Sequence, residues 1–144
     1  VGSEMCIRDR RVTREVAQRL ITGDYTPLLQ SREAFAAECY ALMQSRCYRP
    51  KAIVEYDRKA FIAKENKIRV TFDSRIVATE SSFDLFDERL NMAPVLAPGA
   101  VVMEVKYNGF LLDYIRRMIN TVDQSELSVS KYMLARQNGY RYRL

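Results

Sequence analysis

The residues best suited to chemistry in this sequence lie in a strand-like stretch bounded by Gly99 and Gly109. Successive side chains of a β-strand alternate between its two faces, so Glu104 and Lys106 share one face. The other face is apolar and carries Val101, Met103, Val105 and Tyr107. A separation of about 7 Å along the strand predicts that Glu104 and Lys106 hold a charged ligand between them rather than pair tightly. A solvated outer face is the alternative interpretation of a single Glu-x-Lys pair.

Two further stretches also carry charge on one predicted face. Residues 51–62 place Tyr56 and Arg58 on the same face. Residues 67–73 alternate between a polar face and an apolar one, which carry Arg69, Thr71 and Asp73 and, opposite them, Ile68, Val70 and Phe72. The polar segment 64–66 predicts a turn, and hence an antiparallel hairpin. Strands with one charged and one apolar face are typical of a β-barrel with a hydrated, charged lumen.

The composition indicates a globular domain with acidic partners. Of the 144 residues, 48% are hydrophobic and 28% are charged, as in soluble domains. The net charge of +5 favours phosphates, nucleic acid or an anionic surface as partners. No apolar run approaches the roughly 18 residues of a membrane helix, because Pro94 and Pro98 interrupt the best candidate.

Several kinds of site are excluded by residues that the sequence lacks. It has no histidine, which excludes histidine-based triads, general bases and metal sites. Its five glycines form neither of the common phosphate-binding loops, so side chains must hold any phosphate. Any metal must be bound by oxygen atoms, which favours magnesium or manganese. Cys6, Cys39 and Cys47 lack metal-ligand spacing and predict reduced thiols, and therefore a cytoplasmic protein.

The remaining segments predict helices and loops that support these strands. Residues 1–10 resemble a translated sequencing-adaptor segment and are set apart as a non-native leader, which leaves 11–144 as the domain. A first helix is predicted over 11–21, capped by Thr13 and ended by Gly23. A second is predicted over 31–45, with Ser31 as its N-cap and a buried face of Phe35, Cys39, Leu42 and Met43. Residues 80–98 indicate a loop with a strand fragment.

A third predicted helix follows the Gly99–Gly109 strand and is expected to pack on the apolar face of that strand. Its apolar stripe comprises Phe110, Leu111, Tyr114, Ile115, Met118 and Ile119. Residues 128–132 predict the start of a further strand or helix. The tail 139–144 alternates aromatic residues with arginines, a pattern that could contact nucleic acid by stacking and charge. A frayed terminus is the favoured interpretation.

Four motifs carry a resemblance to a known family. In order and spacing, the chain from Arg11 to Arg136 resembles the later part of the VTC domain, the polyphosphate polymerase domain of the triphosphate tunnel metalloenzyme superfamily. The motifs are VEYDRKAF at 54–61, RVTFD at 69–73, MEVKY at 103–107 and SKY at 130–132. The resemblance implies an α+β fold, in which packing helices accompany an antiparallel β-barrel whose lumen is lined by lysines, arginines and glutamates.

The resemblance also implies a reaction and a set of roles. A nucleoside triphosphate enters the tunnel, and its γ-phosphoryl group passes to a polyphosphate chain with the help of Mn²⁺ or Mg²⁺. Glu104 would hold the metal, and Arg58, Arg69, Glu104 and Lys106 would form the catalytic group. The implied phosphate ligands are Tyr56, Arg58, Arg69, Lys106 and Lys131.

The early motifs of the family, which include an R-x-E-K-like strand and two further basic strands, are not found before Arg11. We therefore expect this chain to be the C-terminal half of a tunnel domain, with an incomplete barrel, and to make no polyphosphate alone. Two alternatives stay open at this point: a triphosphatase of the same fold, and a module that binds polyphosphate or another polyanion without turnover. Nucleic acid is not predicted as a partner, because the aromatic residues in the middle of the chain fall on apolar faces.

Overall fold

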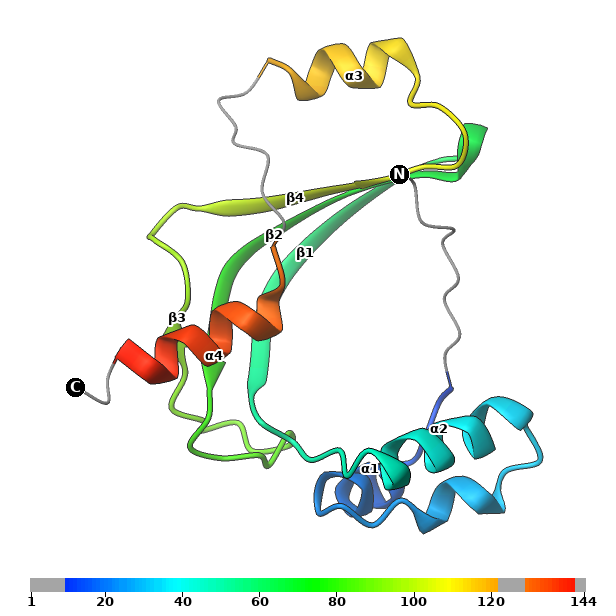
Figure 1. Cartoon of the computed structure of the whole chain (residues 1–144). Helices are drawn as coiled ribbons and strands as arrows, with labels where there is room; N and C mark the ends of the chain where they lie inside the picture. The colour runs from blue at the N-terminus through cyan, green and yellow to red at the C-terminus, as the bar shows by residue number, and fades with distance from the viewer. Residues whose placement is uncertain (1–9, 122–128, 142–144) are drawn as a thin grey trace. The chain divides into compact units, whose positions relative to one another are not determined.

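The computed structural model describes residues 10–121 and 129–141, which form two compact units (Figure 1). The helical unit contains residues 10–53 and 79–91. The sheet unit contains residues 54–78, 92–121 and 129–141. Each unit is described separately below.

The helical unit contains helix α1 (Arg14–Ile21), the 3-10 helix η1 (Thr26–Gln30) and helix α2 (Ala34–Ser45). The predicted cap of α1 is confirmed, because the Thr13 side chain accepts a hydrogen bond from the backbone N–H of Val16 at 3.3 Å. The predicted cap of α2 is wrong. Ser31 instead ends η1, its hydroxyl accepts from the N–H of Glu33, and α2 begins at Ala34.

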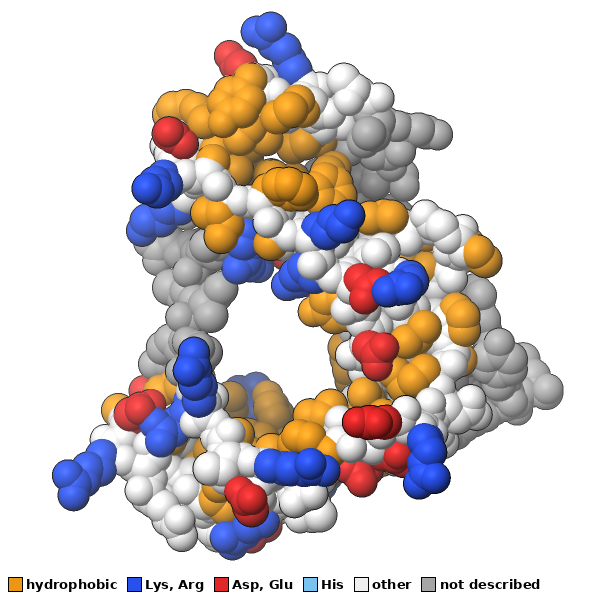
Figure 2. All heavy atoms as spheres, turned by 180° about the vertical axis from the view of Figure 1, so that it is seen from behind, with side chains coloured by type: hydrophobic (Ala, Val, Ile, Leu, Met, Phe, Trp, Pro, Cys, Tyr) orange, Lys and Arg blue, Asp and Glu red, His pale blue; other side chains and the backbone are white. Residues whose placement is uncertain are grey.

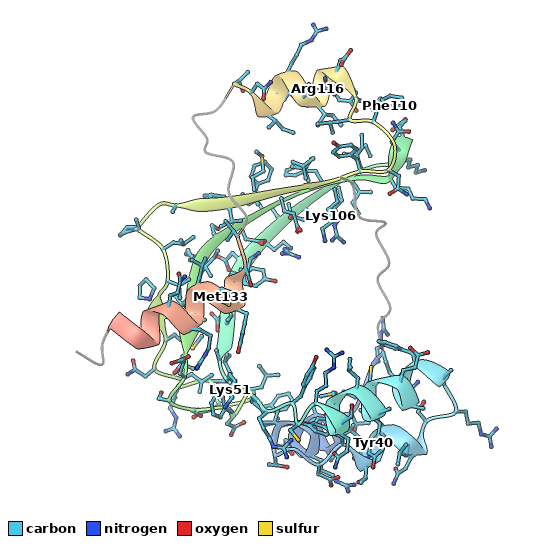
Figure 3. The ribbon with its side chains drawn as sticks, in the orientation of Figure 1. Tyr40, Lys51, Lys106, Phe110, Arg116 and Met133 are labelled. Atoms are coloured by element: carbon cyan, nitrogen blue, oxygen red, sulfur yellow. The ribbon has the colours of Figure 1, made fainter. Side chains whose placement is uncertain are left out.

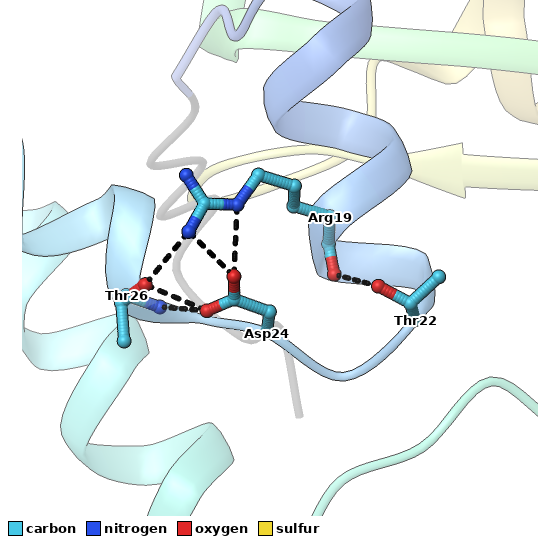
Figure 4. Close-up of polar contacts among 4 residues, drawn as sticks. All are labelled: Arg19, Thr22, Asp24 and Thr26. Carbon is cyan, nitrogen blue, oxygen red and sulfur yellow. Dashed lines mark hydrogen bonds and ion pairs between the residues drawn. The ribbon is translucent and has the colours of Figure 1, made fainter.

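The turn between α1 and η1 is held by a local network around Asp24 (Figure 4). Its carboxylate accepts hydrogen bonds from Arg19 Nε at 2.8 Å and from the Thr26 hydroxyl at 2.6 Å. The backbone N–H of Thr26 donates to the same carboxylate. Gly23 precedes this network with a φ of +89°, a conformation that glycine adopts without strain.

The core of the helical unit lies where η1 packs on α2. Its buried residues are Tyr25, Leu28 and Ala36, and Leu20, Cys39, Tyr40 and Met43 pack around them. Figure 3 labels Tyr40 on α2. Of the predicted buried face of α2, Phe35, Cys39 and Met43 are partly buried, whereas Leu42 is 42% exposed. The fully buried residue of α2 is Ala36, which packs with Tyr25 and Leu28.

The sheet unit is organised around one long strand, β2 (Ile68–Thr79). Strand β1 (Ile53–Ala63) joins it through the short 3-10 turn η2 (Glu65–Lys67), which confirms the predicted hairpin. On its other edge β2 pairs antiparallel first with β4 (Val101–Lys106) and then with β3 (Ala93–Pro94). The predicted strand fragment within 80–98 is confirmed by β3, and β2 runs beyond the predicted stretch 67–73 to Thr79.

Strand β2 changes its partner at an irregular residue. Arg75 has a φ of 51°, the left-handed region that arginine rarely adopts. It lies between Ser74, the last residue paired with β4, and Val77, the first paired with β3. The irregular residue interrupts the strand alternation there, as a bulge does. Figure 1 shows that β2 bends strongly along its length.

Helix α3 (Asp113–Ile119) is shorter than predicted, and much of its apolar stripe is not covered. Ile115 is buried, whereas Phe110, Tyr114 and Met118 are each more than half exposed. Figure 2 shows hydrophobic side chains gathered at the top of the view, over the end of the sheet unit that carries α3. The preceding loop is fixed to the hairpin turn by Asn66, whose side chain donates to the Phe110 carbonyl at 2.8 Å.

The last element is helix α4 (Lys131–Arg141). Of the two elements predicted to start within 128–132, a strand or a helix, the helix is therefore the one present. Its backbone extends into the predicted tail 139–144, whose residues 142–144 lie outside the described residues. The leader 1–10 is described only at Arg10, and Cys6 is outside the description. Cys39 and Cys47 are free thiols.

The α+β class is confirmed by these elements. Among the described residues the sheet is not closed into a barrel, since β1 forms one edge and β4 and β3 form the other. The tunnel fold therefore stays a prediction. No helix in residues 10–121 or 129–141 is long and apolar enough to span a membrane.

Candidate functional site

One face of the sheet collects the residues that the sequence analysis selected on β2 and β4. Arg69 lies opposite Lys106 in the strand register, and Thr71 lies opposite Glu104. Directly opposed residues of antiparallel strands share a face, so these four side chains lie together, as their alternation predicted. Figure 3 shows Lys106 on the side of the sheet away from Phe110 and α3. We call this surface the charged face; it comprises Tyr56, Arg58, Arg69, Thr71, Asp73, Glu104 and Lys106.

Asp73 connects β2 to β1 and α4. Its side chain is 0% exposed, and its two oxygens accept hydrogen bonds from Arg58 Nε at 2.6 Å and Arg58 Nη2 at 2.7 Å. Lys131 Nζ lies 2.6 Å from the same carboxylate. A bidentate arginine pair with a second cation fixes both cations in position. Asp73 thus brings together two residues that are far apart in the sequence.

The electrostatics of this cluster follow from its short contacts. The hydrogen bonds from Arg58 hold the pKa of Asp73 at about 2, against its ordinary value of 3.8, although burial opposes this shift. The same hydrogen bonds raise the pKa of Arg58. The carboxylate and the guanidinium are therefore both charged at neutral pH, and two cations share one carboxylate.

Tyr56 forms a platform for both cations of this cluster. The guanidinium carbon of Arg58 and the ammonium nitrogen of Lys131 each lie 5.1 Å from the centre of its ring. Contacts of this kind are favourable because the ring face is electron-rich. Lys131 is the first residue of α4, and the Ser130 hydroxyl accepts from the N–H of Met133 at that end of the helix. Tyr56 therefore contacts both Arg58 and Lys131, which are predicted phosphate ligands like Tyr56 itself.

Glu104 and Lys106 form an ion pair, contrary to the expectation that they are too far apart. Lys106 Nζ lies 3.2 Å from Glu104 Oε1. The expectation was based on the backbone spacing along the strand. The long side chains of Glu104 and Lys106 bend toward each other, which brings their charged groups into contact. Both side chains are more than one-third exposed, so the pair contributes at most about 1 kcal/mol to stability. Each side chain is free to exchange its partner for a ligand.

This combination of a charged strand face and a cation at the start of α4 matches the motifs of one family. A family model for the VTC domain matches residues 5–139. The chain belongs to the VTC domain family. VTC domains are associated with functions of the polyphosphate polymerase type. No curated protein and no solved structure matches the chain.

The capacity of this VTC domain to hold a metal depends on Glu104. Among residues 10–121 and 129–141, no three carboxylate or thiol side chains gather into a group that could bind a metal alone. Asp73 is occupied by its two cations, which leaves Glu104 as the accessible carboxylate of the charged face. Magnesium is commonly held by one or two carboxylates together with substrate phosphates and water. The donor set therefore fits an ion that binds together with a phosphate ligand.

Asp73 is the residue of the VTC domain site that sequence reasoning missed. Alternation places it on the polar face of residues 67–73, but the motifs assign it no role. A signal existed, because an acidic residue on a face that otherwise collects cations requires a partner once it is buried. Which cations would reach it depends on how β1, β2 and α4 assemble, and the sequence does not provide that.

Proposed function

We propose that this VTC domain binds the triphosphate chain of a nucleoside triphosphate on its charged face and transfers the γ-phosphoryl group to polyphosphate. One observation carries the proposal: cations from four separate elements converge on one region of the sheet. They are Arg58 of β1, Arg69 of β2, Lys106 of β4 and Lys131 of α4. Such a cluster of cations repels itself, and an anionic chain with many oxygens stabilises it.

The reaction requires from the protein mainly position and charge. A terminal oxygen of polyphosphate attacks the γ-phosphorus, the bond to the β–γ bridging oxygen breaks, and ADP leaves when ATP is the donor. Catalysis of phosphoryl transfer rests on alignment and on the neutralisation of developing charge. Arg58 and Lys131 are held in place by Asp73 and are suited to alignment. Lys106 is held only by an exposed ion pair and can turn to the phosphate.

In this proposal Glu104 holds Mn²⁺ or Mg²⁺ together with the phosphate oxygens. The bound ion would neutralise charge on the β- and γ-phosphates. Glu104 would then exchange its contact with Lys106 for the cation, and the freed ammonium group would contact phosphate. The charge of this part of the site would stay balanced when the metal and the triphosphate enter together.

The partners in this proposal are a nucleoside triphosphate and polyphosphate, and we place the reaction in the cytoplasm. Both substrates are polyanions, which fits the net charge of +5. The free thiols of Cys39 and Cys47 fit a reducing compartment.

Binding of tripolyphosphate without metal, measured by titration calorimetry on the 144-residue protein, tests the first step. Lys106→Ala should weaken binding about tenfold, because it removes a charge-assisted contact. Arg75→Gln is the matched control. It also removes a cation from β2, but Arg75 is 81% exposed and pairs with Asp57, which belongs to the other face of β1. The control should leave binding unchanged.

The second step is tested with the polypeptide encoded by the complete gene, ATP and Mn²⁺. Lengthening of polyphosphate with release of ADP is the expected result. Release of free phosphate alone would show a triphosphatase, and binding without turnover would show a binding module. Equal weakening by Arg75→Gln and Lys106→Ala, or no binding at all, would overturn the assignment of the charged face.

A further inference from the structure

Two buried polar atoms on the charged face have no hydrogen-bond partner among the described residues: Arg69 Nε and Thr71 Oγ1. Thr71 is 2% exposed, so its hydroxyl does not lie on the open surface. Both residues belong to β2 and, two positions apart, point to the same face. Buried polar groups in folded proteins are nearly always paired, and an unpaired one calls for an explanation.

The neighbouring side chains do not supply the missing partner. The Asp73 carboxylate is taken by Arg58 and Lys131, and the Glu104 carboxylate by Lys106. Thr71 lies between these two occupied carboxylates, next to Asp73 along the strand face and opposite Glu104 in the register. The carboxylates on both sides of Thr71 therefore have partners, whereas the Thr71 hydroxyl has none among the described residues.

The chemistry of the two atoms defines what is missing. Arg69 Nε is a donor only, and a threonine hydroxyl can donate one hydrogen bond. A ligand that satisfies both must bring acceptor oxygens. A phosphate group meets this requirement, since its oxygens accept from a guanidinium and a hydroxyl at the same time.

We infer that Thr71 is a phosphate ligand, which together with Arg69 forms a binding position for one phosphate of the substrate chain. This inference rests on the proposed function and extends it to a neutral residue. Because Thr71 lies opposite Glu104, the phosphate held there is the one beside the carboxylate proposed to hold the metal. The threonine would add a directional hydrogen bond to a site whose other ligands are charged side chains. It would thereby fix the position of the substrate's phosphate chain along these cations.

Substitution of Thr71 separates this role from a structural one. Thr71→Val keeps the shape but removes the hydroxyl, so metal-free binding of tripolyphosphate to the 144-residue protein should weaken about tenfold. The resistance of the protein to urea should stay equal or rise, because an unpaired buried hydroxyl is lost. Thr71→Ser keeps a hydroxyl and should retain most of the affinity.

Thr79→Val is the matched control, since Thr79 is a buried threonine of the same strand whose hydroxyl is paired with Ser81 at 2.9 Å. It should lower stability and leave binding unchanged. Wild-type affinity in Thr71→Val, with binding still weakened by Lys106→Ala, would overturn the inference while the proposed function stands, and would indicate that the hydroxyl faces a buried water. Absence of tripolyphosphate binding by the wild-type protein would overturn both.

Discussion

Asp24 in the helical unit and Asp73 in the sheet unit both accept hydrogen bonds from an arginine, but their partners reach them in different ways. Every partner of Asp24 named above lies between Arg19 of α1 and Thr26 of η1, as Figure 4 shows. The partners of Asp73 come from β1 and from α4. The first network is local and exposed, and the second is assembled by the tertiary structure and buried.

The difference determines what each carboxylate can do. Hydrogen bonds from Thr26 and Arg19 lower the pKa of Asp24, but water competes for every group around it. Asp73 is shielded from solvent, so its contacts fix Arg58 and Lys131 beside the Tyr56 ring. The local network stabilises a turn, whereas the long-range network positions cations that a ligand can use.

The largest expected effect concerns turnover. In the polypeptide encoded by the complete gene, Glu104→Gln should lower ATP turnover by about a hundredfold or more, because it removes the charge that would hold the divalent cation. Binding of tripolyphosphate without metal should be retained or become tighter, since a repelling carboxylate is lost. The measurement is ATP turnover against Mn²⁺ concentration, beside metal-free binding.

Asp24→Asn is the control in the helical unit and should leave turnover unchanged. Unchanged turnover in Glu104→Gln would end the case for Glu104 as the metal ligand. The residue would then be a partner of Lys106 on an exposed surface, no more functional than Asp24.

A second expected effect compares the two carboxylates by their contribution to stability. Asp73→Ala should lower the free energy of unfolding by about 2–3 kcal/mol, because Arg58 and Lys131 lose their shared buried partner. Asp24→Ala should have a smaller effect, since its partners are exposed and can bind water instead. Urea unfolding of the two variants measures both. A loss for Asp24→Ala as large as that for Asp73→Ala would contradict the distinction between a local and a long-range network.

The smallest expected effect is a dependence on pH. The pKa of Asp73 is about 2 in the folded protein and 3.8 ordinarily, so its ionised form stabilises the fold. This contribution, about 2 kcal/mol, is fully present above pH 5 and is lost as the pH falls from about 4 to 2. The unfolding free energies of the wild-type protein and of Asp73→Asn should therefore converge over that range. A difference that stays constant from pH 5 to pH 2 would show that the ionisation of Asp73 does not stabilise the fold.

The sequence by itself determined the elements with regular patterns. Alternation was enough to assign Arg69, Glu104 and Lys106 to one face, because the two-residue period of a strand leaves only two faces to choose from. The hairpin and the Thr13 cap were likewise predictable, since a turn or a cap depends on a few neighbouring residues. The four motifs were sufficient to indicate the family to which the chain belongs.

Only the tertiary structure decided which side chains meet. The burial of Asp73 between Arg58 and Lys131 depends on three elements coming together, and no local pattern encodes that distance. The ion pair of Glu104 and Lys106 depends on side-chain conformations, which residue spacing does not fix. The unpaired hydroxyl of Thr71 is visible only once its neighbours are known to be occupied. Long-range contacts are set by the packing of the whole unit, and for that reason the strand faces could be predicted while the bonds across them could not.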